Sequence, residues 1–85
     1  MRVQIPSALR SYTESAQAQA DGATLGEVLA DLDRQYPGIR FRVIDEQGKI
    51  RRHIRIFVNG VSADTMSLKM QPGDEVILVQ ALSGG

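Results

Sequence analysis

The sequence contains no cysteine, no tryptophan and a single histidine among its 85 residues. Without cysteine the chain cannot form a disulfide framework, a thiolate metal site or a cysteine nucleophile. The one histidine, His53, follows Arg51 and Arg52, and these cationic neighbours make it a poor metal ligand. No GxSxG-like element accompanies it, so a histidine-activated serine is also not expected. We therefore predict no bound metal and no conventional catalytic site.

An excess of charge of one sign is missing as well, because ten basic and ten acidic side chains cancel. General nucleic-acid binders are normally strongly basic, so this balance argues against that class. No apolar run approaches the length of a membrane span, and residues 1–6 lack the apolar core of a signal peptide. We expect a soluble, cytoplasmic protein that binds neither nucleic acid nor a membrane.

The residues that are present can build one modest core. The chain is 42% hydrophobic but only 5% aromatic, so Ile, Val, Leu and Ala must supply most of the core. A chain of this length has no room for a second core. We predict a single domain over residues 1–80, followed by a C-terminal tail over residues 81–85.

Alternation of apolar and polar residues predicts a mixed sheet of four to five strands. The strongest signal, at residues 75–80, is rich in β-branched residues and follows the turn residues 72–74. The first two strands are expected to form an antiparallel hairpin with a long turn around residues 8–14. The segment 39–44 fits both a strand and a helical turn. The predicted strands cover residues 2–5, 15–20, 54–58, 61–63 and 75–80.

One amphipathic helix is predicted between the second and third strands. Thr24 and Glu27 have the spacing of a capping box at its start, and Pro37 ends it. A helix on one face of a mixed sheet is an α+β arrangement, and a parallel central pair of first and last strands makes it a β-grasp fold. The apolar stripe of the helix consists of Leu25, Val28, Leu29, Leu32 and Tyr36.

Two surfaces are candidates for binding a partner. Ile77 and Val79 must face away from the helix, because side chains alternate between the two faces of a strand. Together with Phe57, and with Leu82 in the tail, they would form an apolar patch of the kind that marks a partner surface. A covering loop or a dimer mate is the alternative.

The second candidate surface is basic. Six cationic side chains between residues 40 and 55 outnumber two nearby acidic ones, and such clusters accelerate encounter with an acidic partner. A solvated surface without a partner is the alternative. We predict partner contacts for Arg51, Arg52 and Arg55. The other members of the cluster are Arg40, Arg42 and Lys49.

The C-terminal sequence Leu82-Ser83-Gly84-Gly85 is the strongest candidate for a reactive group. Glycine has no Cβ and can enter a narrow channel. An α-carboxylate has a reference pKa of roughly 3.5 and is ionised at neutral pH. We predict that Gly85 supplies the reacting carboxylate and that Ser83 and Gly84 give it access. Fully extended, residues 81–85 would reach roughly 17 Å. A frayed end is the alternative.

The order of these features resembles the ubiquitin-like sulfur carriers of the ThiS/MoaD family. The start of the chain and the segment 48–59 are most similar to the CysO-type branch, whose members serve a cysteine synthase. The motifs that carry the resemblance are Ile5-Pro6-Ser7-Ala8-Leu9-Arg10, Thr24-Leu25, Gly48-Lys49-Ile50, Ile56-Phe57-Val58-Asn59-Gly60, Gly73-Asp74-Glu75-Val76 and Ser83-Gly84-Gly85.

The resemblance implies a protein cosubstrate that is not itself an enzyme and binds no cofactor. An E1-like adenylating enzyme would use ATP to activate the Gly85 carboxylate. A sulfurtransferase or other persulfide donor would convert it to a thiocarboxylate. A synthase, such as a PLP-dependent cysteine synthase, would then accept the sulfur. Two alternatives remain: the small subunit of molybdopterin synthase, and a ubiquitin-like modifier joined to lysines through Gly85.

Overall fold

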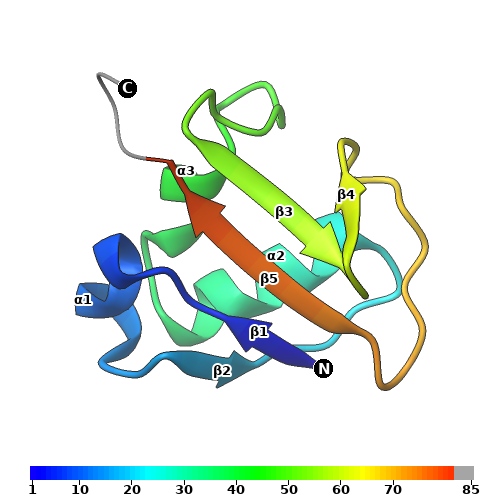
Figure 1. Cartoon of the computed structure of the whole chain (residues 1–85), viewed down its shortest axis with the longest axis horizontal. Helices are drawn as coiled ribbons and strands as arrows, with labels where there is room; N and C mark the ends of the chain where they lie inside the picture. The colour runs from blue at the N-terminus through cyan, green and yellow to red at the C-terminus, as the bar shows by residue number, and fades with distance from the viewer. Residues whose placement is uncertain (82–85) are drawn as a thin grey trace.

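The chain forms a five-stranded sheet with the order β2-β1-β5-β3-β4 (Figure 1). The computed structural model describes residues 1–81. β1 and β5 are parallel at the centre of the sheet, and the other neighbouring strands are antiparallel. The predicted central pair of first and last strands is therefore confirmed. The strands are β1 (Arg2–Gln4), β2 (Gln17–Gln19), β3 (Ile54–Val58), β4 (Val61–Ala63) and β5 (Glu75–Gln80).

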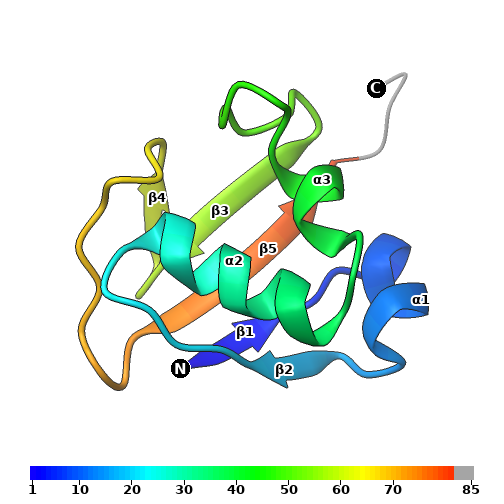
Figure 2. The same ribbon diagram turned by 180° about the vertical axis from the view of Figure 1, so that it is seen from behind.

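The helices α2 and α3 lie on one face of this sheet (Figure 2). This confirms the predicted α+β, β-grasp architecture with one main helix. No helix within residues 1–81 has the length and apolar character needed to cross a membrane. The helical elements are η1 (Ser7–Leu9), α1 (Arg10–Thr13), α2 (Leu25–Gln35) and α3 (Ile39–Val43).

Helix α2 begins where the sequence predicts. The Thr24 side chain accepts a hydrogen bond from the Glu27 amide at 3.2 Å, and the Glu27 carboxylate accepts one from the Ala23 amide at 3.3 Å. Two amides near the helix start are thus satisfied by side chains. The stripe formed by Leu25, Val28, Leu29 and Leu32 is fully buried against the sheet, so the apolar face of α2 builds the core.

The segment that fits two patterns folds as the helix α3. Gly38 has a φ of 100°, which favours glycine, and turns the chain out of α2. The Asp33 carboxylate accepts hydrogen bonds from the amides of Gly38 and Arg40 at 3.0 and 3.1 Å, which fixes the first turn of α3. Ile39 and Val43 are buried as a result, while Phe41 projects outward with 55% of its surface exposed.

The connection between β1 and β2 differs from the expected long turn. It contains η1 and α1, two consecutive helical turns. Leu9 is buried in the core and Thr13 is nearly so, which explains why this segment is compact. Glu14 then adopts a left-handed conformation with a φ of 55° and leads the chain into β2.

Candidate functional site

The C-terminal tail leaves the sheet beside β3. The Ala81 amide donates a hydrogen bond of 2.7 Å to the His53 carbonyl, so β5 stays paired up to the last described residue. The predicted reactive residue Gly85 and the residues Leu82, Ser83 and Gly84 lie outside the described residues 1–81. The site is therefore described from the root of the tail and the surfaces around it.

The outer face of the sheet carries the predicted apolar patch. Phe57 on β3 lies directly beside Ile77 on β5 in the register of the sheet. Both side chains are partly exposed, and Val79 is 39% exposed. The helices α2 and α3 cover the opposite face, so they leave the face of the sheet seen in Figure 1 uncovered. We call this group, Phe57, Ile77 and Val79, the apolar patch.

Polar side chains border the apolar patch on both sides. The strand register places Gln4 beside Ile77, and Gln17 beside Gln4, toward one edge of the sheet. Toward the other edge, Ser62 lies beside Phe57. An apolar centre with a polar rim is typical of protein interfaces. The arrangement can therefore bind a protein surface.

The three arginines predicted to contact a partner do not form one group. Arg55 lies beside Val79 in the register and donates hydrogen bonds to two backbone carbonyls of its own segment, at 3.1 and 3.2 Å. Arg51 turns toward α3, where its Nε donates to the Phe41 carbonyl at 2.6 Å and its guanidinium stacks 4.5 Å from the Phe41 ring centroid. Arg52 is exposed in the loop before β3.

The basic cluster keeps its charges available. The ion pairs within residues 1–81 join other groups: the amino terminus to Asp21, Arg2 to Glu75, and Arg34 to Asp31. None of the six cationic side chains between residues 40 and 55 pairs with a described carboxylate. Their charge is therefore available to attract an acidic partner.

A cavity of about 290 Å³ lies at the root of the tail, between α3 and the start of β3. The sequence patterns did not single out Phe41 or Gln80, which both line it. If residues 39–44 are taken as a helix, Phe41 lies on the side opposite Ile39 and Val43. The helical alternative could therefore have indicated that Phe41 is exposed when Ile39 and Val43 are buried. The lining residues are Phe41, Arg42, Arg51, His53, Ile54 and Gln80.

The loop after α3 is organised by one carboxylate. Asp45 accepts hydrogen bonds from the amides of Gln47 and Lys49 at 2.8 and 3.0 Å. The Lys49 amide is the largest cause that holds the pKa of Asp45 below its ordinary value of 3.8. The loop therefore gains stability from the charged form of Asp45.

We expect this loop to keep its hydrogen bonds from neutral pH down to 3.8, the ordinary pKa, and to lose them only at lower pH. A lowered pKa in the folded state means that the contribution is complete above the unfolded pKa and disappears as pH falls through the folded one. Amide chemical shifts of Gln47 and Lys49 in a pH titration measure this. Asp45→Ala should remove the transition, and a transition midpoint above 3.8 would contradict the prediction.

The sequence was compared with protein families and with individual proteins, and the matches cover nearly the whole chain. The family model described as the ThiS family matches residues 3–85. The sulfur carrier protein CysO of Mycobacterium tuberculosis is 35% identical, over 98% of this chain and 96% of its own length. Small archaeal modifier protein 3 of Haloferax volcanii is also 35% identical, over 76% of this chain and 73% of its own.

The fold comparison agrees with the sequence comparison. The crystal structure of an Amycolatopsis orientalis BexX/CysO complex contains a chain that matches with a TM-score of 0.90 and 30% identity, covering 99% of this chain and 98% of that one. The crystal structure of CysO from Mycobacterium tuberculosis matches with a TM-score of 0.89 and 33% identity, covering 95% and 98%.

Proposed function

Because the chain belongs to the ThiS family, we propose that it is a sulfur carrier protein whose Gly85 carboxylate is converted to a thiocarboxylate. The extent of the sequence match carries the proposal. The family match extends to Gly85, and the similarity to CysO covers nearly the full length of both chains. The likeness therefore includes the end of the sequence on which carrier chemistry depends.

The proposed chemistry needs an adenylating enzyme with an E1-like activity. One oxygen of the Gly85 carboxylate attacks the α-phosphorus of ATP, and pyrophosphate leaves. The resulting acyl-adenylate has a good leaving group, AMP, which a carboxylate lacks. When sulfide is the sulfur source, its attack on the acyl carbon expels AMP and leaves a thiocarboxylate. In the cell a sulfurtransferase or other persulfide donor would supply this sulfur. The terminal sulfur of the persulfide would attack the acyl carbon and expel AMP, and a thiol would then reduce the S–S bond of the resulting acyl disulfide to release the thiocarboxylate.

The chain supplies the reacting carboxylate and the surface that the partner enzymes bind, while the partner enzymes supply the catalysis. The apolar patch and its polar rim provide a surface for a partner, and β5 leads directly from that surface to the tail. With Gly84 and Ser83 next to the reacting carbon, the tail can enter a narrow active site. The chain binds no cofactor in this scheme and acts as a cosubstrate.

The sulfur acceptor we propose is a biosynthetic synthase, such as a PLP-dependent cysteine synthase. The support is the sequence similarity to CysO, which extends over more of both chains than the sequence similarity to the archaeal modifier proteins. A relative of this chain has been crystallised as a complex with another protein, BexX. Delivery of sulfur within a complex of two proteins is therefore compatible with this fold.

Attachment to lysine side chains is a second candidate function, favoured by the 35% identity with small archaeal modifier protein 3. The same acyl-adenylate could be attacked by a lysine amine, which would give an isopeptide bond. Conjugates that survive denaturation would support the modifier. A free chain that carries sulfur would support the carrier, and stable copurification with a large subunit would support the molybdopterin synthase alternative.

Intact-mass measurement tests the proposed function. The chain is incubated with a candidate activating enzyme of the same organism, ATP and sulfide. We expect its mass to increase by the difference between sulfur and oxygen, and only when ATP is present. The assay runs over every candidate activator, and failure to gain sulfur with all of them would contradict the proposal.

A further inference from the structure

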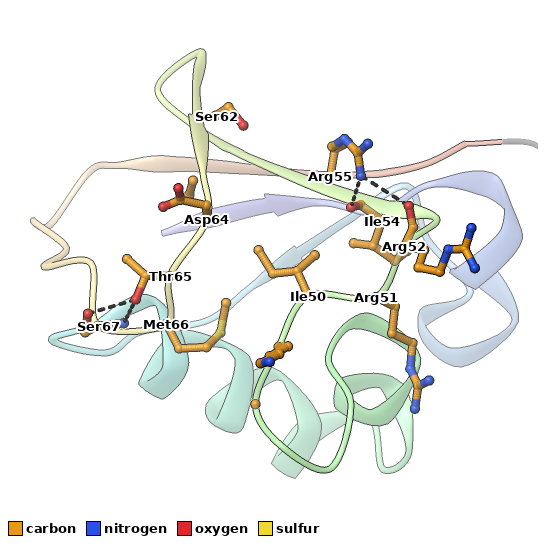
Figure 3. Close-up of a pocket in the computed structure, with 13 residues that line it drawn as sticks. Ile50, Arg51, Arg52, Ile54, Arg55, Ser62, Asp64, Thr65, Met66 and Ser67 are labelled. Carbon is orange, nitrogen blue, oxygen red and sulfur yellow. Dashed lines mark hydrogen bonds between the residues drawn. The ribbon is translucent and has the colours of Figure 1, made fainter.

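A groove of about 810 Å³ lies beside β3 (Figure 3). Two of its lining residues, Arg55 and Ser62, also lie beside the apolar patch in the strand register. The groove runs between the loop at residues 48–52 and the segment at residues 62–67. β5 pairs with β3 along residues 54–58, whereas β4 pairs only with residues 56–58. The groove therefore follows the stretch of β3 that has no strand on its outer side.

Backbone hydrogen bonds hold both walls of the groove. On one side, Ile44 and Ile50 form a β-bridge, and the Asp45 amide donates to the Lys49 carbonyl at 2.8 Å. On the other side, the Gly26 amide at the start of α2 donates to the Met66 carbonyl at 2.9 Å. A groove with fixed walls needs little ordering when it binds, which favours affinity.

The floor of the groove is apolar. Ile54 and Ala63 are buried at its base, and Ile50 and Met66 are only partly buried. Figure 3 shows Ile50 and Met66 projecting into the space between the two walls. The volume of the groove lies within the range of about 300–1,000 Å³ that is typical of ligand sites. Its apolar floor can take up an aliphatic or aromatic side chain.

The residues that line the groove carry an excess of positive charge. Four of its lining residues are cationic, Lys49, Arg51, Arg52 and Arg55, and Asp64 is the only acidic one. The Arg55 guanidinium donates hydrogen bonds to the Arg52 and Ile54 carbonyls. These two backbone acceptors are therefore already occupied and are not available to pair with a ligand. A ligand would therefore be held by its side chains and charges more than by pairing as an added strand.

We propose that this groove binds an acidic segment of a partner protein, with an apolar side chain on the floor and a carboxylate against Lys49. The charge of the lining residues selects acidic groups, and the floor requires an apolar neighbour. A nucleic acid fits less well, because the floor has no aromatic side chain on which a base could stack. This binding goes beyond sulfur transfer and does not depend on the chemistry of the tail.

The two lysines of the chain provide a matched test. Lys49 lines the groove, while Lys69 is exposed and lies outside it. The probe is a set of fluorescent hexapeptides in which Leu or Phe alternates with Asp or Glu, with charge-reversed peptides containing Lys as the comparison. We expect saturable binding of acidic peptides only, with amide shifts at Ile50 and Met66. Lys49→Glu should weaken it by about tenfold, and Lys69→Glu should leave it nearly unchanged.

Two further variants test the groove floor and its independence from the tail. A chain lacking Gly85 should bind the acidic peptides as well as the full chain does, which makes groove binding independent of the proposed sulfur transfer. Ile50→Thr should weaken binding, because it removes apolar surface from the floor. The proposal is overturned if no acidic peptide binds saturably, if charge-reversed peptides bind equally well, if both lysine variants lose affinity equally, or if a single-stranded oligonucleotide binds more tightly than any peptide.

Discussion

Deleting Gly85 is expected to slow the gain of sulfur by about 100-fold or more while leaving the domain folded. The proposed reaction occurs at the carboxylate of this residue. In the deletion variant a carboxylate remains on Gly84, but it is displaced by one residue, about 3.4 Å, from where the partner must position it against ATP. A misplacement of that size removes most of the advantage of positioning. Intact mass after incubation with activator, ATP and sulfide measures the effect.

Gly84→Val is a companion variant that separates the width of the tail from its length. It keeps the carboxylate of Gly85 at its normal distance but adds a β-branched side chain next to it. If the tail must pass through a narrow channel, the variant should gain sulfur much more slowly than the full-length parent. A deletion variant that gains sulfur at the normal rate would exclude Gly85 as the reacting residue, and a fast Gly84→Val would exclude the narrow channel alone.

The architecture could be predicted from the sequence because its signals are local and agree with one another. The alternation at residues 54–58 and 75–80 fixed the two strands and the faces of their side chains, including the outward position of Ile77. Thr24 and Glu27 marked the start of α2 within one residue. Where the apolar pattern, the capping residues and the turn residues all indicate the same structure, the element can be predicted from nearby residues alone.

Short segments were harder to predict. Residues 39–43 span little more than one helical turn, so a period of 2 and a period of 3.6 cannot be distinguished from Ile39 and Val43 alone. The deciding contact is the Asp33 carboxylate, which fixes the amides that begin α3. In the same way, burial of Leu9 turns the expected loop before β2 into helical turns.

The candidate surfaces were predictable only in part. The apolar patch follows from alternation and strand pairing, since neighbours on one face must come from known strands. The groove does not, because Ile50 and Met66 are far apart in the sequence and are brought together only by the folded chain. The basic cluster likewise looked uniform in the sequence, but Arg51 and Arg55 turn to different backbone segments.

Replacing Phe57 or Ile77 with aspartate is expected to lower the rate constant kcat/KM for activation by about 30-fold or more. Both side chains lie at the centre of the apolar patch, and a charge there would be buried without a partner in the complex. Loss of a central interface residue typically costs about 2 kcal/mol or more, which corresponds to this change in rate. The measurement is the rate of pyrophosphate release with the activating enzyme and ATP.

Val61→Asp is the control for this experiment. Val61 is an apolar residue at the start of β4 with 69% of its surface exposed, outside the apolar patch. It receives the same charge without disturbing the proposed interface, so activation should stay near that of the parent. Melting temperatures of all three variants show whether each domain remains folded. If folded Phe57→Asp and Ile77→Asp are activated as fast as Val61→Asp, the activating enzyme does not bind the outer face of the sheet.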